Sequence, residues 1–124
     1  IEADSTAMQR IMLKSKIHRA TLTGAELNYE GSISIDELLM EKADLLPGEQ
    51  VHVLNVNTGD RLVTYVITAP RGSGEIMLNG PAARCGMPGD PLVIISYGHL
   101  DEKNARTYKP IIVHVDAQNR PMNK

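Results

Sequence analysis

Hydrophobic and polar residues alternate with a period of two along most of this chain, which is the spacing of half-buried β-strands. Turn-forming residues gather between these stretches, and Asn57-Thr58-Gly59-Asp60 is a typical hairpin signal. The pattern predicts strands over residues 11–23 (as one strand or two), 32–35, 51–56, 61–68, 75–78, 92–96 and 111–115. Many short strands joined by tight turns are typical of a small β-rich barrel or sandwich.

One segment has the spacing of a helix instead. Asp36 is a suitable N-cap, leucines follow one stripe through residues 37–46, and Pro47 would end the helix. Residues 81–84 and 101–106 are each long enough for one short helical segment. We therefore expect a mainly β fold with one or two short helices.

The chain has 124 residues, which is the length of one domain. Residues 1–7 lack periodicity and Met8 looks like a natural start, so we treat 1–7 as an extension or cloning remnant. Residues 117–124 are polar and contain Pro121, which is typical of a flexible tail. The folded domain is expected to span residues 8–116.

Composition and charge exclude several classes of protein. Hydrophobic residues make up 42% of the chain, so we do not expect disorder as the main state. The formal net charge of −2 argues against a general nucleic-acid or anionic-membrane surface. Apolar runs such as residues 92–95 are too short to cross a bilayer, and no signal peptide is visible. One cysteine, Cys85, permits no internal disulfide and suits a reducing cytoplasm.

Three candidate chemistries find little support. No two of the four histidines have the spacing of metal ligands, so no metal site is predicted. Residues 71–74 are rich in glycine but lack the lysine of a phosphate-binding loop. Cys85 has no base near it in the sequence, so a structural thiol is the simpler interpretation. These patterns alone indicate a β-rich domain of unknown function.

A more specific signal lies in residues 27–36, where Gly31 is followed by Ser32. A Gly-Ser pair alone is usually a turn, but three further blocks accompany it, at residues 13–20, 57–65 and 79–83. The order and spacing of the four blocks resemble the aspartate 1-decarboxylase family of small pyruvoyl-dependent enzymes. The resemblance covers about residues 8–116.

The resemblance implies a double-psi β-barrel that assembles as a homotetramer. It also implies self-cleavage between Gly31 and Ser32 into a β chain (1–31) and an α chain (32–124). The Ser32 hydroxyl would attack the uncrowded Gly31 carbonyl and turn the amide into an ester. Elimination and loss of ammonia would leave a covalent pyruvoyl cofactor at residue 32, with no need for pyridoxal phosphate or a metal.

A pyruvoyl ketone suits amino-acid decarboxylation, because it forms a Schiff base with the substrate amine and accepts the electrons released with carbon dioxide. The implied activity is the conversion of L-aspartate to β-alanine in pantothenate biosynthesis. The expected partners are this substrate and the other subunits, in the cytoplasm, with neither nucleic acid nor membrane. Some members of the family need a helper protein for cleavage, and the sequence leaves this open.

Two neighbouring residues are implicated in catalysis by the resemblance. Tyr65 corresponds to the family's proton donor, and Thr64 to the threonine that polarises the glycine carbonyl during cleavage. Without the resemblance, both would be taken as ordinary strand residues. Alternation places their side chains on opposite faces unless a bulge or strand end intervenes.

Basic residues are the candidates for binding an acidic substrate. Arg61 shares a face with Tyr65, and its guanidinium suits the carboxylate that the substrate keeps. Lys16 and His18 share a face of their strand and would complete a positive pocket, although a solvated lysine is the commoner case. Tyr29 lies close to the cut and is expected either to orient the bond or to pack.

The block Asn79-Gly80-Pro81-Ala82 corresponds to the substrate-binding turn, with Asn79 expected to hold the turn or the threonine. Pro81 departs from the family, in which alanine is more usual here. Because proline has no N–H, any contact made by that amide would be lost, although a pre-set turn would compensate.

Two alternatives stay open. One is a pyruvoyl decarboxylase for a different acidic amino acid, because Arg61 and Lys16 favour an acidic substrate without fixing its length. The other is an unprocessed barrel that acts as a binding or oligomerisation module. The presence of Ser32, Thr64 and Tyr65 together argues against the second.

Overall fold

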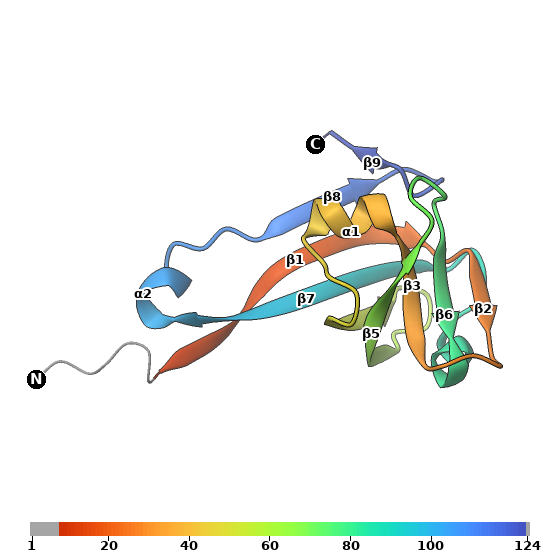
Figure 1. Cartoon of the computed structure of the whole chain (residues 1–124), viewed down its shortest axis with the longest axis horizontal. Coiled ribbons are helices and arrows are strands. Elements are labelled where there is room, and N and C mark those ends of the chain that lie inside the picture. The colour runs from red at the N-terminus through yellow and green to blue at the C-terminus, as the bar shows by residue number, and fades with distance from the viewer. Residues whose placement is uncertain (1–7, 124) are drawn as a thin grey trace, which may run out of the picture.

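Nine strands and three short helical segments make up residues 8–123, the part of the chain that this computed structural model describes (Figure 1). In chain order they are β1 (Gln9–Thr21), β2 (Gly24–Glu26), β3 (Ser32–Asp36), α1 (Glu37–Ala43), β4 (Gln50–Asn55), β5 (Arg61–Ala69), β6 (Ile76–Asn79), the 3-10 helix η1 (Gly80–Cys85), β7 (Pro91–Asp101), α2 (Glu102–Ala105), β8 (Ile111–Val115) and β9 (Pro121–Met122). The mainly β fold with few short helices that the pattern predicts is confirmed. The extension 1–7 lies outside the described residues.

The strands form one sheet in the order β2-β6-β3-β5-β4-β7-β1-β8-β9. The pairs β2–β6, β3–β5 and β1–β8 are parallel, and the other neighbours are antiparallel. β5 changes partner along its length, because residues 61–65 pair with β4 and residues 66–69 pair with β3. This change brings the middle of β5 beside the start of β3.

The core is aliphatic, as a chain without Phe or Trp requires. Alternate residues of the central strands point into it and are fully buried, among them Ile17, Ile33, Ile35, Val51, Val53, Val66, Ile76, Leu78 and Leu92. Helix α1 adds Leu39, Met40 and Ala43 and packs against β1, β3 and β8. All five residues of β3 are buried, so this strand lies wholly inside the protein.

Helix α1 begins at the predicted residue but ends at Ala43, earlier than the leucine stripe indicates. Asp36 caps its start by accepting a hydrogen bond from the Leu38 N–H at 2.8 Å. Asp44 then adopts a left-handed conformation with φ 56°, which stops the helix. The chain turns there, so Leu45 is buried and Leu46 is exposed.

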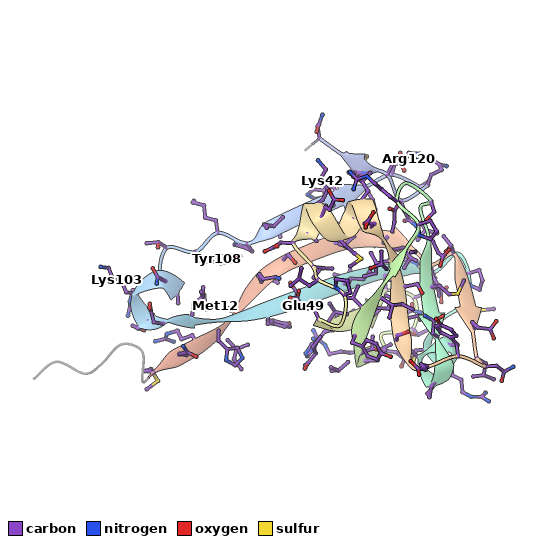
Figure 2. All side chains as sticks on the ribbon, viewed as in Figure 1. Met12, Lys42, Glu49, Lys103, Tyr108 and Arg120 are labelled. Carbon is purple, nitrogen blue, oxygen red and sulfur yellow. The ribbon has the colours of Figure 1, made fainter. Side chains whose placement is uncertain are left out.

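β7 runs to Asp101, well beyond the predicted strand over 92–96. The additional residues pair with Gln9–Leu13 of β1. Together they form a long two-stranded arm that ends at α2, on the left of Figure 1. Met12 and Lys103, labelled in Figure 2, mark this end of the arm. The sequence pattern missed the extension because the residues of the arm are exposed or only half-buried, so no fully buried face imposes alternation.

The structure differs from the expectation of a flexible tail over residues 117–123. Pro121 and Met122 form β9, which pairs with β8. Asn119 is 1% exposed, and its amide nitrogen donates to the carbonyl oxygens of Thr21 and Gly74, each at 2.8 Å. Polar composition gave no sign of these contacts, because they join residues far apart in the sequence.

Candidate active site

The bond between Gly31 and Ser32 lies where the chain passes from the surface into the core. Tyr29 and Glu30 are exposed and Gly31 is half-buried, whereas Ser32 is 0% exposed. Ser32 is the first residue of β3, which is paired on one side with β6 and on the other with β5. The serine is therefore fixed in the sheet, while the residues before it belong to an exposed turn.

The Asn79 side chain holds the Ser32 hydroxyl. Its amide nitrogen donates to the Ser32 Oγ at 3.0 Å and to the Ser34 Oγ at 2.9 Å. The Ser32 hydroxyl in turn donates to the Glu30 carbonyl oxygen at 3.2 Å. Asn79 was expected to hold the turn or the threonine, and the structure shows it bonded to two serines. Ser34 is a site residue that the sequence reasoning missed, although the spacing Ser-x-Ser on a strand places both hydroxyls on one face.

The turn after Asn79 lies directly against the cut. Gly80 has a φ of +62°, and a β-carbon built on it would lie 2.5 Å from the Tyr29 carbonyl oxygen and 2.7 Å from the Gly31 nitrogen. A β-carbon on Gly31 would lie 3.5 Å from the Pro81 Cδ. Because only glycine lets the two backbones approach so closely, Gly80 fixes the turn beside Gly31.

A cavity of about 320 Å³ brings several of the expected residues together. Its lining comes from three parts of the chain, namely Gly31, Leu62, Val63, Thr64, Pro81, Ala82 and Cys85. Gly31, Thr64 and the turn residues Pro81 and Ala82 thus share one cavity. Cys85 lines it as well, which its isolation in the sequence did not reveal.

Tyr65 lies on the other face of β5 from Thr64. The antiparallel register between β4 and β5 runs without a shift through both residues, so their side chains alternate as the pattern predicts. Val66, the next residue, pairs with Ile33 in the parallel ladder, so Tyr65 lies beside the start of β3. Thr64 lines the cavity beside Gly31, and Tyr65 does not.

Arg61 lies on the same face of β5 as Tyr65 and is in contact with His52 of β4. The Arg61 Nη1 lies 3.0 Å from the His52 Nδ1, and because arginine carries only donors, this histidine nitrogen accepts. The His52 ring packs edge-on against Tyr97 with centroids 5.0 Å apart. Beside them is a second cavity of about 320 Å³, lined by Ile11, Glu49, Gln50, His52, Tyr97 and His99.

Lys16 and His18 lie on β1, four strands from β3 in the order of the sheet. They alternate with the buried Ser15 and Ile17, so they share a face as predicted. The His18 ring lies edge-on to that of His114, with centroids 5.7 Å apart. His18 borders a cavity of about 390 Å³ that is different from the one beside Gly31. Within one chain, the two basic residues and the cut belong to different parts of the sheet.

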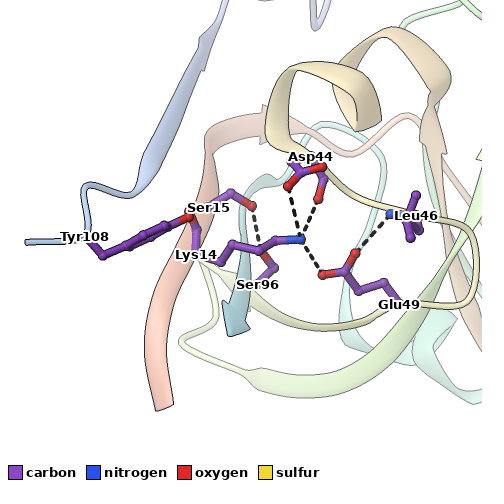
Figure 3. A network of polar contacts seen from close by, with 7 residues as sticks. All are labelled: Lys14, Ser15, Asp44, Leu46, Glu49, Ser96 and Tyr108. Carbon is purple, nitrogen blue, oxygen red and sulfur yellow. Dashed lines mark hydrogen bonds and ion pairs between the residues drawn. The ribbon is translucent and has the colours of Figure 1, made fainter. Parts of the chain in front are cut away.

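A polar network secures β1 where it enters the body of the protein (Figure 3). The Lys14 ammonium donates to the Asp44 carbonyl oxygen and, at 2.7 Å, to Glu49. Glu49 also accepts from the Leu46 N–H at 3.0 Å, and the Tyr108 hydroxyl donates to the Lys14 carbonyl at 3.2 Å. The network fixes the strand that carries Lys16 and His18 to the loop before β4.

A second polar network connects the end of η1, where Cys85 lines the cavity, to the end of β4. The Asn55 amide donates to the Cys85 carbonyl at 3.0 Å and to an Asp90 carboxylate oxygen at 2.9 Å. Hydrogen bonds from Asn55, from the Met87 N–H and from Asn57 hold the pKa of the Asp90 carboxyl below its usual value. The charged form of Asp90 thus ties the loop after η1 to the turn between β4 and β5.

Among residues 8–123, no group of three or more His, Cys, Asp or Glu side chains is arranged to hold a metal ion. No helix in this part of the chain is both long and apolar enough to cross a membrane.

The fold and the site together define a small mainly β protein in which a Gly-Ser bond stands at the entry of a buried strand. The family model for aspartate decarboxylase matches residues 8–122 of the chain. The aspartate 1-decarboxylase of Thermoanaerobacter pseudethanolicus is 56% identical over 116 residues, which are 94% of this chain and 99% of that protein. The corresponding protein of Pelotomaculum thermopropionicum is 62% identical over 109 residues, 88% of this chain and 83% of its own.

The chain therefore belongs to the aspartate decarboxylase family. This confirms the resemblance that four sequence blocks indicated. The fold class is accordingly the double-psi β-barrel of that family, with which the sheet is consistent.

Proposed function

We propose that this protein is a carboxy-lyase that converts L-aspartate to β-alanine and carbon dioxide, after cutting its own chain between Gly31 and Ser32. The observation that carries the proposal is the arrangement at the cut. The Ser32 hydroxyl is buried and held by Asn79, while Gly31 lines a cavity together with Thr64. The names of relatives at 56% and 62% identity support the activity.

Self-cleavage needs only the atoms of the chain and water. The Ser32 Oγ bonds to the Gly31 carbonyl carbon, the bond from that carbon to the Ser32 nitrogen breaks, and the hydroxyl proton passes to the nitrogen. The resulting ester loses the Ser32 Cα proton and breaks between Cβ and Oγ, which leaves Gly31 as a carboxylate. Water then replaces the nitrogen of the dehydroalanine, ammonia leaves, and residue 32 becomes a pyruvoyl group.

Thr64 and Asn79 have separate roles in this reaction. Thr64 shares the cavity of Gly31, so we assign its hydroxyl to polarising the Gly31 carbonyl as negative charge develops on the oxygen. Asn79 binds the attacking oxygen and limits its movement, which favours a reaction that depends on orientation. Tyr29, exposed beside the cut, is assigned to orienting the bond.

The surroundings of residue 32 fit a pyruvoyl cofactor. It has the same three carbon atoms as the serine from which it forms, and Gly80 leaves clear the space that a β-carbon would fill against the Gly31 backbone. When formed, the group binds the substrate amine and takes up the electrons released with carbon dioxide. Tyr65, which precedes the residue that pairs with Ile33, is assigned to returning a proton to the substrate carbon.

Substrate recognition is assigned to the basic residues. Arg61 shares the Tyr65 face, and the His52 contact fixes its guanidinium, which suits the carboxylate that aspartate keeps. Lys16 and His18 belong to another part of the same sheet. We infer that a second subunit supplies them to complete the pocket with Asn79, Gly80, Pro81 and Ala82. The resemblance to the family favours a homotetramer as the working form. The single cysteine agrees with a cytoplasmic location.

The test is a product assay on matured protein. Wild type should form β-alanine from L-aspartate, and Ser32→Ala should form none because no hydroxyl remains to attack Gly31. Incubation with and without cell extract decides whether a helper protein is needed. L-Glutamate in a parallel reaction tests the other acidic substrate. Absence of β-alanine from a fully cleaved protein would overturn the assignment to aspartate.

A further inference from the structure

Ser34 is a buried polar residue on β3. It lies two residues after Ser32 on β3, between Ile67 of β5 and Met77 of β6. It is 6% exposed, and its neighbours on the strand, Ile33 and Ile35, are fully buried. A buried hydroxyl is costly unless it is hydrogen-bonded, and here the partner is Asn79 at 2.9 Å.

The Asn79 amide has two hydrogens, and both have a partner. One goes to Ser32 at 3.0 Å and the other to Ser34 at 2.9 Å. The Ser32 hydroxyl hydrogen points to the Glu30 carbonyl, so the Ser32 oxygen must accept from Asn79. This requirement sets the nitrogen of the amide, rather than its oxygen, toward both serines. Asn79 is itself 1% exposed, and with Ser34 it borders a cavity of about 270 Å³.

We propose that Ser34 is a positioning residue for self-cleavage, because it holds the Asn79 amide in the orientation that fixes the attacking oxygen of Ser32. The inference rests on the proposed self-cleavage at Gly31–Ser32. Without Ser34, one amide hydrogen loses its partner, and the amide is free to rotate away from Ser32. A nucleophile that leaves its reactive orientation reacts more slowly, even when its own chemistry is unchanged.

The role of Ser34 is confined to the stage before self-cleavage converts Ser32 to another group. Cleavage removes the Ser32 hydroxyl, which is the group that Asn79 orients. Ser34 should therefore affect the rate at which the chain is cut more than the rate at which a fully cut enzyme turns over aspartate. A residue that served only the stability of the sheet would have no such preference.

The test is the first-order rate of chain cleavage, followed on a denaturing gel under conditions in which wild type matures. Ser34→Ala should cleave about fivefold more slowly, the factor that corresponds to one hydrogen bond of ordinary strength. Ser34→Thr keeps a hydroxyl and should restore the rate, whereas Ser34→Val, of the same size, should not. The Thr and Val pair decides the question if Ser34→Ala does not fold.

Two controls separate orientation from stability. Ser96→Ala also removes a buried hydroxyl, one that lies 2.5 Å from the Ser15 hydroxyl on β1, and should leave the cleavage rate unchanged. In an Asn79→Ala background, Ser34→Ala should have no further effect, because Ser34 acts through that amide. A wild-type rate for Ser34→Ala, an equal loss in Ser96→Ala, or a full effect in the Asn79→Ala background would overturn the inference. Failure of wild type to cleave would instead overturn the proposed function.

Discussion

Gly80 and Gly31 are packed backbone against backbone, so that a β-carbon on residue 80 would stand 2.7 Å from the Gly31 nitrogen. This contact joins the turn after β6 to the bond that we propose is cut. It explains why a glycine with φ +62° stands at this position, since any other residue would push the turn away from the cut.

Gly80→Ala should therefore block cleavage and lower the melting temperature. Gly59→Ala is the matched control, because Gly59 also has a positive φ, +79°, but nothing within 4 Å of its would-be β-carbon. That control should cost about 1 kcal/mol of stability from backbone strain alone and should cleave normally. Gel analysis and thermal melting of both variants check this. Normal cleavage in Gly80→Ala would show that the close packing has no role.

Tyr65 and Thr64 should separate turnover from cleavage, because they lie on opposite faces of β5. Tyr65→Phe should cut its chain normally and decarboxylate aspartate about 10²–10⁴-fold more slowly, the usual contribution of a general acid. Thr64→Val should fail first at cleavage. Mass analysis scores the cut, and chromatography of β-alanine scores turnover. A cut Tyr65→Phe protein with normal turnover would make His18 the next candidate for the proton donor.

Arg61→Ala should raise the KM for aspartate about 10- to 100-fold while the chain is still cut, because a charged hydrogen bond to the substrate carboxylate is lost. The control is Arg120→Ala, which should behave as wild type. Arg120 is exposed and lies just before β9, the last strand in the order of the sheet (Figure 2). Steady-state kinetics on fully cut protein decide. An unchanged KM in Arg61→Ala would move carboxylate binding to Lys16.

Asp90 should contribute to stability in a pH-dependent way. Its pKa is lowered by hydrogen bonds from Asn55, the Met87 N–H and Asn57, so the folded state favours the charged form. The stabilisation is therefore complete above the ordinary aspartate pKa of about 3.9 and is lost as the pH falls through the lower folded value. Urea unfolding of wild type and Asp90→Asn should give a stability difference that shrinks below about pH 4. A difference that does not vary with pH would contradict this.

Much of the fold follows from local patterns in the sequence. Alternation located the strands because every second residue of most strands faces the core, as Ile33 and Ile35 do on β3. Asp36 marked the start of α1 because an N-cap acts within the same turn. The sequence did not predict the arm of β1 and β7 or the contacts of Asn119, because both depend on partners far away in the sequence.

The site divides in the same way. The block around Gly31 and Ser32 was found through its resemblance to a family, and the faces of Thr64 and Tyr65 followed from strand alternation. The bond from Asn79 to Ser34 was not found, because it joins two strands whose register the sequence does not specify. The cavity that brings Cys85 beside Gly31 is likewise a product of packing.

The most direct test of the account is the intact mass of the matured protein under denaturing conditions. The account predicts two chains, residues 1–31 with a free carboxylate at Gly31 and residues 32–124 with no free N-terminal amine. The second chain should be lighter, by the mass of one ammonia, than the same chain beginning with serine. A single uncut chain after prolonged incubation with and without cell extract would contradict the central claim, and so would a second chain that begins with unmodified Ser32.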